Sequence, residues 1–248
     1  MTRPLSSGEL KTMREAGQVA AKILKRIKAF IKPGISTKEI EEFFEIELSK
    51  YPGMEPAFKG FMGYPASCCV SVNEEIIHGI PSKRIIESGD IVSVDLGIKY
   101  KSLFVDTAYT YLVGRCSLLA KKLVKVSRKA LYEGIRRIRV EASLGDVSFA
   151  IQQSVEKNGF SVIRKFVGHG IGKELHLPPE VPNFGEKGTG PKLEDGCVIA
   201  VEPMVSAGTY DVDILDDGWT AKTKDNSLAA HFEHTIAITK KGPWVLTS

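Results

Sequence analysis

Two histidines stand close together in a stretch rich in glycine and proline, VGHGIGKELHLPPEVPNFG, residues 167–185. His169 and His176 are two of only five histidines in the chain. The stretch has neither a helical nor an alternating apolar pattern, so we expect a loop there and not a core segment. Imidazoles placed in this way can bind a metal ion or transfer a proton.

Four carboxylates lie within or at the end of apolar runs that predict buried strands. They are Asp95, Asp106, Glu202 and Glu233. Strand alternation places Asp95 on the face opposite the two valines that flank Ser93, and the chain between Asp95 and Asp106 is long enough for a strand, a turn and a returning strand. Glu202 shares a face with the small Ala200. Each carboxylate taken singly is more often solvated or salt-bridged than a ligand.

The two acidic pairs lie in segments that resemble each other. IESGDIVSVDLG (residues 86–97) aligns with KLEDGCVIAVEP (192–203), and FVDTAYTYLVG (104–114) aligns with FEHTIAITKKG (232–242). In the same order, HGI at 78–80 aligns with HGI at 169–171. We interpret this as an internal duplication within one catalytic domain of residues 1–248, with halves of approximately 1–115 and 116–248.

Carboxylates that converge from two related halves would repel one another, and several would have to bind protons unless a cation lay between them. His169 would complete the ligand set that we predict: Asp95, Asp106, His169, Glu202 and Glu233. Oxygen ligands with one nitrogen suit Co, Mn, Fe or Zn, and two adjacent divalent ions are typical of metal-assisted hydrolysis.

The elements that must position these residues can be predicted from local signals. Capping boxes at Ser6–Glu9 and Ser36–Glu39 begin two helices, the first of which ends at Pro33-Gly34. Further helices are expected from 117 to about 139 and from 143 to 158. Strands are expected at 68–72, 91–96, 103–113, around 162, at 197–201 and at 233–239.

Composition limits the class of protein. The 248 residues carry a net charge of +4 and 43% hydrophobic residues, which is ordinary for a globular protein. Neither a membrane-spanning run nor a signal-peptide pattern is present, and the four cysteines have no C-x-x-C pair, so we expect a cytoplasmic protein with reduced thiols. We also expect a monomer. Basic clusters at 121–125 and 136–139 have helical spacing, and a solvated helix face explains them better than contact with ribosomal RNA.

Several motifs in order resemble those of the methionine aminopeptidases, in particular the short type I form without an N-terminal extension. They are MREAG at 13–17, NEEIIHGIP at 73–81, VDLG at 94–97, VDTA at 105–108, GHGIG at 168–172, VEP at 201–203 and FEHT at 232–235. The resemblance covers essentially the whole chain. It implies an α+β pita-bread fold, in which two pseudo-symmetric αβ halves enclose a dinuclear metal centre.

The resemblance also implies an activity: removal of the N-terminal methionine from peptides and nascent chains whose second residue is small. Proline-type aminopeptidases share the fold and the ligands, but they usually carry a large additional N-terminal domain. A non-catalytic pita-bread module that binds protein or RNA is the alternative outside enzymes, and the presence of all five ligands counts against it.

Roles for individual residues follow from the same resemblance. Glu202 would be the general base, and His78 would assist near the leaving amine. His176 would polarise the scissile carbonyl or form a hydrogen bond with the substrate amide. The methionine pocket would be formed by Phe61, Tyr64, Cys69 and Trp219, with ordinary core packing as the alternative for Phe61. Two positions depart from the family pattern. Leu175 replaces an aromatic before His176, and His231 replaces a glutamine. We expect His231 at a solvent-exposed strand edge, with a place near the metals as the alternative.

Overall fold

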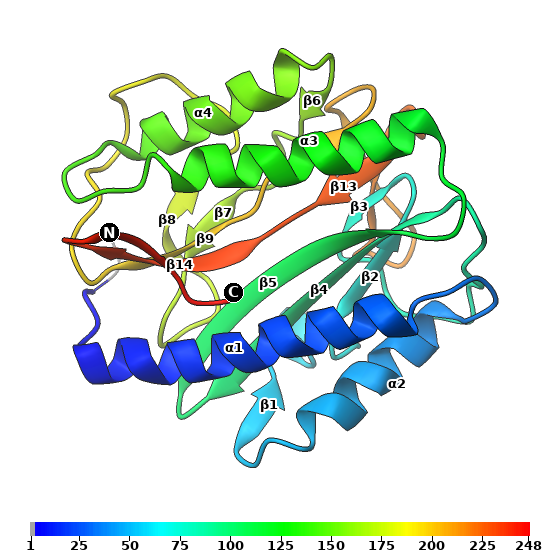
Figure 1. Ribbon diagram of the computed structural model, residues 1–248, viewed down its shortest axis with the longest axis horizontal. Coiled ribbons are helices and arrows are strands. Elements are labelled where there is room, and N and C mark those ends of the chain that lie inside the picture. Colours follow the sequence, from blue (N-terminus) through cyan, green and yellow to red (C-terminus); the bar gives the residue numbers. More distant parts are fainter. Residues whose placement is uncertain (1–2) are drawn as a thin grey trace.

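Two pairs of helices flank a central set of strands in the computed structural model, which describes residues 3–248 (Figure 1). On one side lie α1 (Ser7–Phe30) and α2 (Thr37–Leu48). On the other lie α3 (Leu118–Ile135) and α4 (Leu144–Glu156). These helices agree with the four that capping signals and apolar spacing predict.

Both capping boxes are formed as the sequence indicates. Ser6 accepts a hydrogen bond from the backbone N–H of Glu9, and the Glu9 carboxylate accepts one from the backbone N–H of Ser6 at 2.8 Å. Ser36 and Glu39 make the same reciprocal pair at the start of α2. Because each box satisfies two backbone donors that the first helical turn leaves free, both helix starts are fixed locally.

The strands are short except for two long ones at the centre, β4 (Ile91–Tyr100) and β5 (Leu103–Leu112). The remaining strands before α3 are β1 (Met54–Pro56), β2 (Cys69–Val72) and β3 (Glu75–Ile77), with a 3₁₀ turn at Phe61–Gly63. Those after α4 are β6 (Ser161–Val162), β7 (Gly168–Gly170), β8 (Leu177–Val181), β9 (Val198–Val201), β10 (Met204–Ser206), β11 (Val212–Ile214), β12 (Ala221–Thr223), β13 (Ala229–His231), β14 (His234–Thr239) and β15 (Gly242–Val245).

A tight hairpin between β4 and β5 sets the register of the first two carboxylates. Lys101 and Ser102 form its two-residue turn with φ values of 49° and 60°, the positive values that such hairpin turns require. The resulting register pairs Gly97 with Asp106, and Asp95 with Ala108. Asp95 and Asp106 therefore occupy diagonal positions on one face of the hairpin.

Two sheets carry most of the candidate site. In the first, β4 pairs with β1, β2 and β5. In the second, the strand order is β15-β14-β9-β7-β8. One hydrophobic core packs between α1, α2 and the β2–β4–β5 strands, and another between α3, α4 and strands that include β9 and β14. The two sheets meet where β5 and β14 lie side by side (Figure 1).

The expectation of a loop around His169 is wrong. His169 lies in β7, which pairs with β8 on one side and with β9 on the other. Gly168 makes this possible, because a Cβ there would lie 2.4 Å from the carbonyl oxygen of Ala200. With only three residues, β7 is too short to show an alternating pattern in the sequence. It is recognised as a strand only through its pairing with β8 and β9.

Within the described residues, no helix combines the length and the apolar character that a membrane crossing requires.

Candidate metal centre

The structure brings together all five residues that we predict as metal ligands. One group, in which each residue offers an atom within 4.8 Å of the others, contains Asp95, Asp106 and Glu233. A second such group contains His169, Glu202 and Glu233. Glu233 belongs to both, so the five side chains form one continuous cluster between the two sheets.

The strands around the cluster explain how each side chain reaches it. Asp95 and Asp106 project from β4 and β5, and His169 projects from β7. Glu202 directly follows β9, and Glu233 directly precedes β14. The antiparallel register of these two strands pairs Val201 with His234, so Glu202 and Glu233 leave their sheet at the same end.

Burial and mutual repulsion raise the pKa of the carboxyl groups in the cluster. Burial, followed by the charges of Asp106 and Glu202, raises the pKa of Asp95 well above its ordinary value. Burial and then the Asp106 charge raise the pKa of Glu202. Burial and the other three carboxylates raise the pKa of Glu233 in the same direction. Without a cation the cluster would therefore hold protons at neutral pH.

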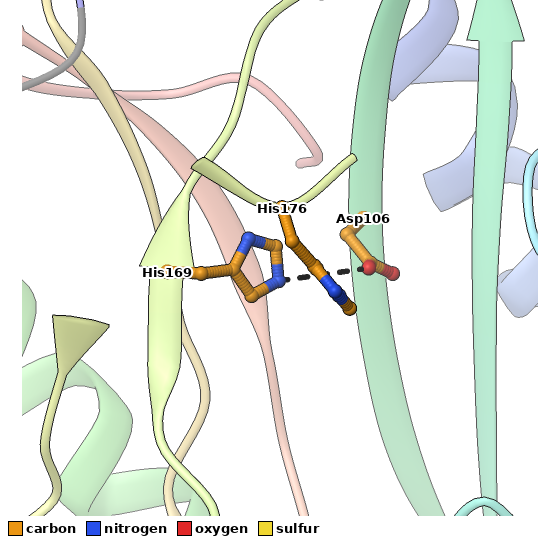
Figure 2. A group of neighbouring side chains, drawn as sticks. All are labelled: Asp106, His169 and His176. Atoms are coloured by element: carbon orange, nitrogen blue, oxygen red, sulfur yellow. Dashed lines mark ion pairs between the residues drawn. The ribbon is translucent and has the colours of Figure 1, made fainter. Parts of the chain in front are cut away.

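The orientation of His169 points its basic nitrogen at these carboxylates. Its Nδ1 donates a hydrogen bond to the carbonyl oxygen of Gly170 at 2.9 Å, which leaves the lone pair on Nε2. Nε2 lies 3.6 Å from Oε1 of Glu202 and 4.0 Å from Oδ2 of Asp106, and Figure 2 shows the contact with Asp106. Burial and the nearby His176 lower the pKa of His169 to about 3, which favours the neutral ring.

Buried oxygens without partners show that the cluster fits a cation. Within residues 3–248, Oδ1 of Asp95, Oδ1 of Asp106 and Oε1 of Glu233 are buried and accept no hydrogen bond. A buried polar atom without a partner is costly, and a divalent ion among these oxygens and Nε2 of His169 would satisfy them all. The donor set of carboxylates and one imidazole suits such an ion.

Two residues that the sequence analysis missed hold Asp106 and Glu202 in place. The hydroxyl of Thr235 makes hydrogen bonds with both backbone groups of Asp106. The side-chain amide of Asn183, which is fully buried, donates to the carbonyl oxygen of Glu202 at 3.1 Å. Thr235 lies inside the FEHT motif, so its position could have indicated a role. Asn183 carries no comparable signal, because its partner is known only from the fold.

A cavity of about 150 Å³ opens directly onto the cluster. Besides the five clustered residues, it is lined by Phe58, Phe61, Met62, Tyr64, Cys69, His78, Leu175, His176 and Trp219. All six residues predicted as substrate contacts are therefore among its walls. Phe58, Met62 and Leu175 are further wall residues, and apolar Leu175 occupies the place where the family pattern has an aromatic.

Aromatic contacts shape the apolar end of this cavity. Tyr64 is buried against Trp219, with ring centroids 5.2 Å apart. Its hydroxyl lies within hydrogen-bonding distance of the carbonyl oxygens of Cys68 and Gly79. The polar end of Tyr64 is thus satisfied by backbone, and its ring presents an apolar surface to the cavity.

Two further histidines, His176 and His78, line the cavity. His176 is exposed, and its ring packs against that of His169 with centroids 4.3 Å apart (Figure 2). The His176 ring also lies against Phe61, at 5.1 Å between centroids. His78 contacts Phe166 and has a φ of 60°. This left-handed conformation is strained for a histidine, and such strain often marks a functional position. Burial, then the nearby His176, lowers the pKa of His78 to about 4.

The expected exposure of His231 is wrong. The residue is only 1% exposed, and its Nε2 lies 3.7 Å from Oε2 of Glu202. Its backbone N–H and carbonyl both bond to the hydroxyl of Thr110 on β5. β13 is the edge strand of its three-stranded sheet, but the β4–β5 hairpin packs against it. His231 is therefore covered by neighbours that the local sequence does not reveal.

The fold and this buried cluster define a metallopeptidase, and comparison with known proteins gives the family. The sequence profile of metallopeptidase family M24 matches residues 11–240. The chain therefore belongs to this family. A prolidase structure from Pyrococcus horikoshii, 24% identical, covers 99% of this chain at a TM-score of 0.78 while the match spans 63% of the longer prolidase. That likeness shows the shared pita-bread fold.

Within the family, the chain groups with the methionine aminopeptidases. It is 47% identical to the methionine aminopeptidase of Clostridium perfringens, over 98% of this chain and 97% of the relative. The crystal structure of methionine aminopeptidase from Thermotoga maritima matches with a TM-score of 0.98 and 46% identity, covering all of both chains.

Proposed function

We propose that this chain removes the N-terminal methionine from peptides and newly made proteins whose second residue is small. The observation that carries the proposal is the buried cluster of five metal-type donors directly beside a cavity with an aromatic, apolar end. The clustered residues would hold the ions that hydrolysis requires, and the apolar end of the cavity would receive one side chain of the substrate. The relatives named as methionine aminopeptidases support the same substrate.

We assign Asp95, Asp106, His169, Glu202 and Glu233 as ligands of two divalent ions. Two donor groups that share Glu233 support two adjacent positions. Co, Mn, Fe and Zn all accept mixed carboxylate and imidazole ligands, and the ion in use depends on supply as well as on the site. Ions bound here would lower the pKa of a water and polarise the substrate carbonyl.

Glu202 is the residue that we assign to proton transfer. Its carboxylate borders the cavity, and its backbone is held by Asn183, so its position is fixed. Oε2 faces His231 and Oε1 faces His169. A carboxylate fixed in this position can take the proton of the attacking water and give it to the leaving amine.

His176 and His78 are assigned to the reacting peptide group. Each would donate a ring N–H, His176 to the carbonyl oxygen on which negative charge develops, and His78 to the amide on the leaving side. Both histidines line the cavity, so a substrate bound there can contact each of them. Burial lowers the pKa of both imidazoles, which favours neutral rings.

The methionine side chain is assigned to the apolar end. Phe61, Tyr64, Cys69 and Trp219 surround a narrow space that suits an unbranched thioether, which packs well against aromatic rings and sulfur. The clustered carboxylates at the other end would receive the free α-amine of the substrate. A site with this layout processes N-termini only.

We further propose that residues 1–248 act as one catalytic domain, as a monomer in the cytoplasm, on chains that are still being synthesised. Contact with ribosomal RNA would use the basic residues of α3. Lys121, Lys122 and Lys125 are all exposed there, which is the support that the fold offers. Charge reversal at these positions should then reduce cosedimentation with ribosomes.

The decisive experiment is hydrolysis of Met-Ala-Ser, Pro-Ala-Ser and Ala-Ala-Ser by metal-stripped protein to which Co, Mn, Fe or Zn is restored. We expect release of methionine alone, dependent on metal, with a rate at least about 100-fold lower in Glu202→Gln. Preferred release of proline would favour a proline-type aminopeptidase. No hydrolysis by folded, metal-loaded protein would favour a binding module.

A further inference from the structure

A second cavity, of about 250 Å³, is lined by residues of α1, β5 and α3. In Figure 1 these two helices flank β5. Because side chains alternate along a strand, the metal cluster and this second cavity lie on opposite faces of the same strands. Asp106 and Glu233 point into the metal cluster, whereas the residues that follow them, Thr107 and His234, line the second cavity. The two sites are therefore separated by the thickness of one sheet.

Aromatic rings form much of the wall of this outer cavity. Tyr109 packs against Tyr111 and Phe232, each at 4.9 Å between ring centroids. The hydroxyl of Tyr111 is already bonded to the carbonyl oxygen of Leu24. These rings leave an apolar slot in which a planar group can stack.

A polar corner closes the slot beside His234. One ring nitrogen of His234 is 3.3 Å from the hydroxyl of Tyr132, and the other is 2.9 Å from the hydroxyl of Thr247. The backbone N–H of Thr235 also bonds to the Thr247 hydroxyl. This network fixes the side chains at the base of the cavity without filling it.

Three cations stand around the opening: Lys25 and Lys28 from α1, and Arg128 from α3. Within residues 3–248, none of them forms an ion pair, and no aspartate or glutamate side chain lines the cavity. The guanidinium of Arg128 lies 5.7 Å from the ring of Tyr109 and 5.9 Å from that of Tyr132. Ring contacts of this kind hold the guanidinium over the slot while its N–H groups stay free.

The positive charge continues past the opening. A neighbouring groove shares Tyr109, Arg128 and Tyr132 with the cavity and adds the side chains of Lys121, Lys125, Lys129 and Arg136. Its one carboxylate, Glu133, is bonded to Arg136. An anion approaching this face would be drawn toward the opening.

We propose that the outer cavity binds a phosphate monoester with a planar, apolar body. The phosphate would lie among Lys25, Lys28 and Arg128, which can supply charge-assisted hydrogen bonds to a dianion. The planar body would lie against the aromatic wall that Tyr109 forms with the other rings. A neutral aromatic compound lacks the first interaction, and inorganic phosphate lacks the second, so neither alone matches the cavity.

The test is titration calorimetry of metal-loaded protein with phenyl phosphate, with phenol and inorganic phosphate as partial probes. The variant Lys28→Gln/Arg128→Gln removes two of the cations at the opening. A matched control, Lys22→Gln/Lys122→Gln, makes the same change of charge on the same helices outside the cavity. Thermal melting of both variants establishes that each is folded.

We expect saturable binding of phenyl phosphate that is stronger than that of either partial probe. The dissociation constant should rise about tenfold or more in Lys28→Gln/Arg128→Gln and stay within about twofold in the control. Equal affinity in both variants would overturn the proposal, because the phosphate would then be bound elsewhere, for instance at the metals. Absence of saturation at about 10 mM ligand would overturn it as well.

Discussion

The hydroxyl of Thr235 joins the two halves of the molecule at Asp106. It donates to the carbonyl oxygen of Asp106 at 2.7 Å and accepts from the backbone N–H of the same residue at 2.8 Å. A single side chain on β14 thus fixes the backbone of a proposed ligand on β5. A related link lies nearby, where the Thr107 hydroxyl donates to the carbonyl oxygen of Glu233.

Replacement of Thr235 should therefore affect both stability and metal binding. Thr235→Val keeps the shape but leaves two buried backbone groups of Asp106 without this partner, which should cost about 2–3 kcal/mol in free energy of unfolding. Thr235→Ser keeps the hydroxyl and should cost about 1 kcal/mol. Urea denaturation measures the first effect, and calorimetric metal titration should show weaker binding in the valine variant only. Equal stability of the two variants would contradict the role assigned to the hydroxyl.

Asn183 should act on the reaction through Glu202. Asn183→Ala removes the donor to the Glu202 carbonyl, so the carboxylate would be less well positioned, and kcat should fall about tenfold with little change in KM. Asn158→Ala is a suitable control, because it removes a bond from an amide to the Ser154 carbonyl, far from the cluster. Steady-state kinetics with Met-Ala-Ser as substrate distinguishes the two variants. A similar loss of kcat in both variants would point to general destabilisation instead.

Removal of the metal should reveal the repulsion within the cluster. Since burial raises the pKa of Asp95 above its usual range, the metal-free protein should bind protons there, and added Mn or Co should raise its melting temperature. Asp95→Asn replaces a carboxyl group whose ionised form is disfavoured by burial and by the neighbouring charges. We expect its metal-free form to be at least as stable as the metal-free parent near pH 8, while most of the stabilisation by metal is lost. Full metal stabilisation of the variant would exclude Asp95 as a ligand.

The N-terminal capping box should make stability depend on pH in the acid range. Hydrogen bonds from the backbone and the hydroxyl of Ser6 lower the pKa of Glu9 to about 2. A lowered folded-state pKa means that the stabilisation is complete above the unfolded value of 4.5 and is lost as the pH falls toward 2. The free-energy difference between the parent protein and Glu9→Gln should therefore shrink between about pH 6 and pH 3. A difference independent of pH would show that the ionised form contributes nothing.

Gly17 should tolerate no side chain. A Cβ at this position of α1 would lie 2.1 Å from the carbonyl oxygen of Leu246, which belongs to the segment that Arg14 binds through two carbonyl oxygens. Gly17→Ala should thus destabilise the protein by about 1–3 kcal/mol, because backbone must move apart. Gly8→Ala lies on the same helix with no contact closer than 3.9 Å and should be neutral or stabilising by up to about 1 kcal/mol. Thermal unfolding of both variants checks the contrast.

Local signals in the sequence were sufficient to predict the helices and the kinds of residue that form the central cluster. Capping boxes and apolar spacing act over a few residues, so the starts of α1 and α2 could be placed from Ser6 and Ser36. The two central strands followed from their alternation. The carboxylates within or beside the predicted strands, together with the order of the motifs, predicted both the family and the five residues that the fold gathers.

Only the tertiary structure decided which segments cover one another. His169 lies in a strand and His231 is buried because distant strands pair beside them, and no short-range pattern records such pairing. The supports that Thr235 and Asn183 provide, and the cationic cavity behind the cluster, likewise join residues far apart in the chain. Burial and strand pairing depend on long-range contacts, whereas the sequence specifies directly only what a residue and its near neighbours can do.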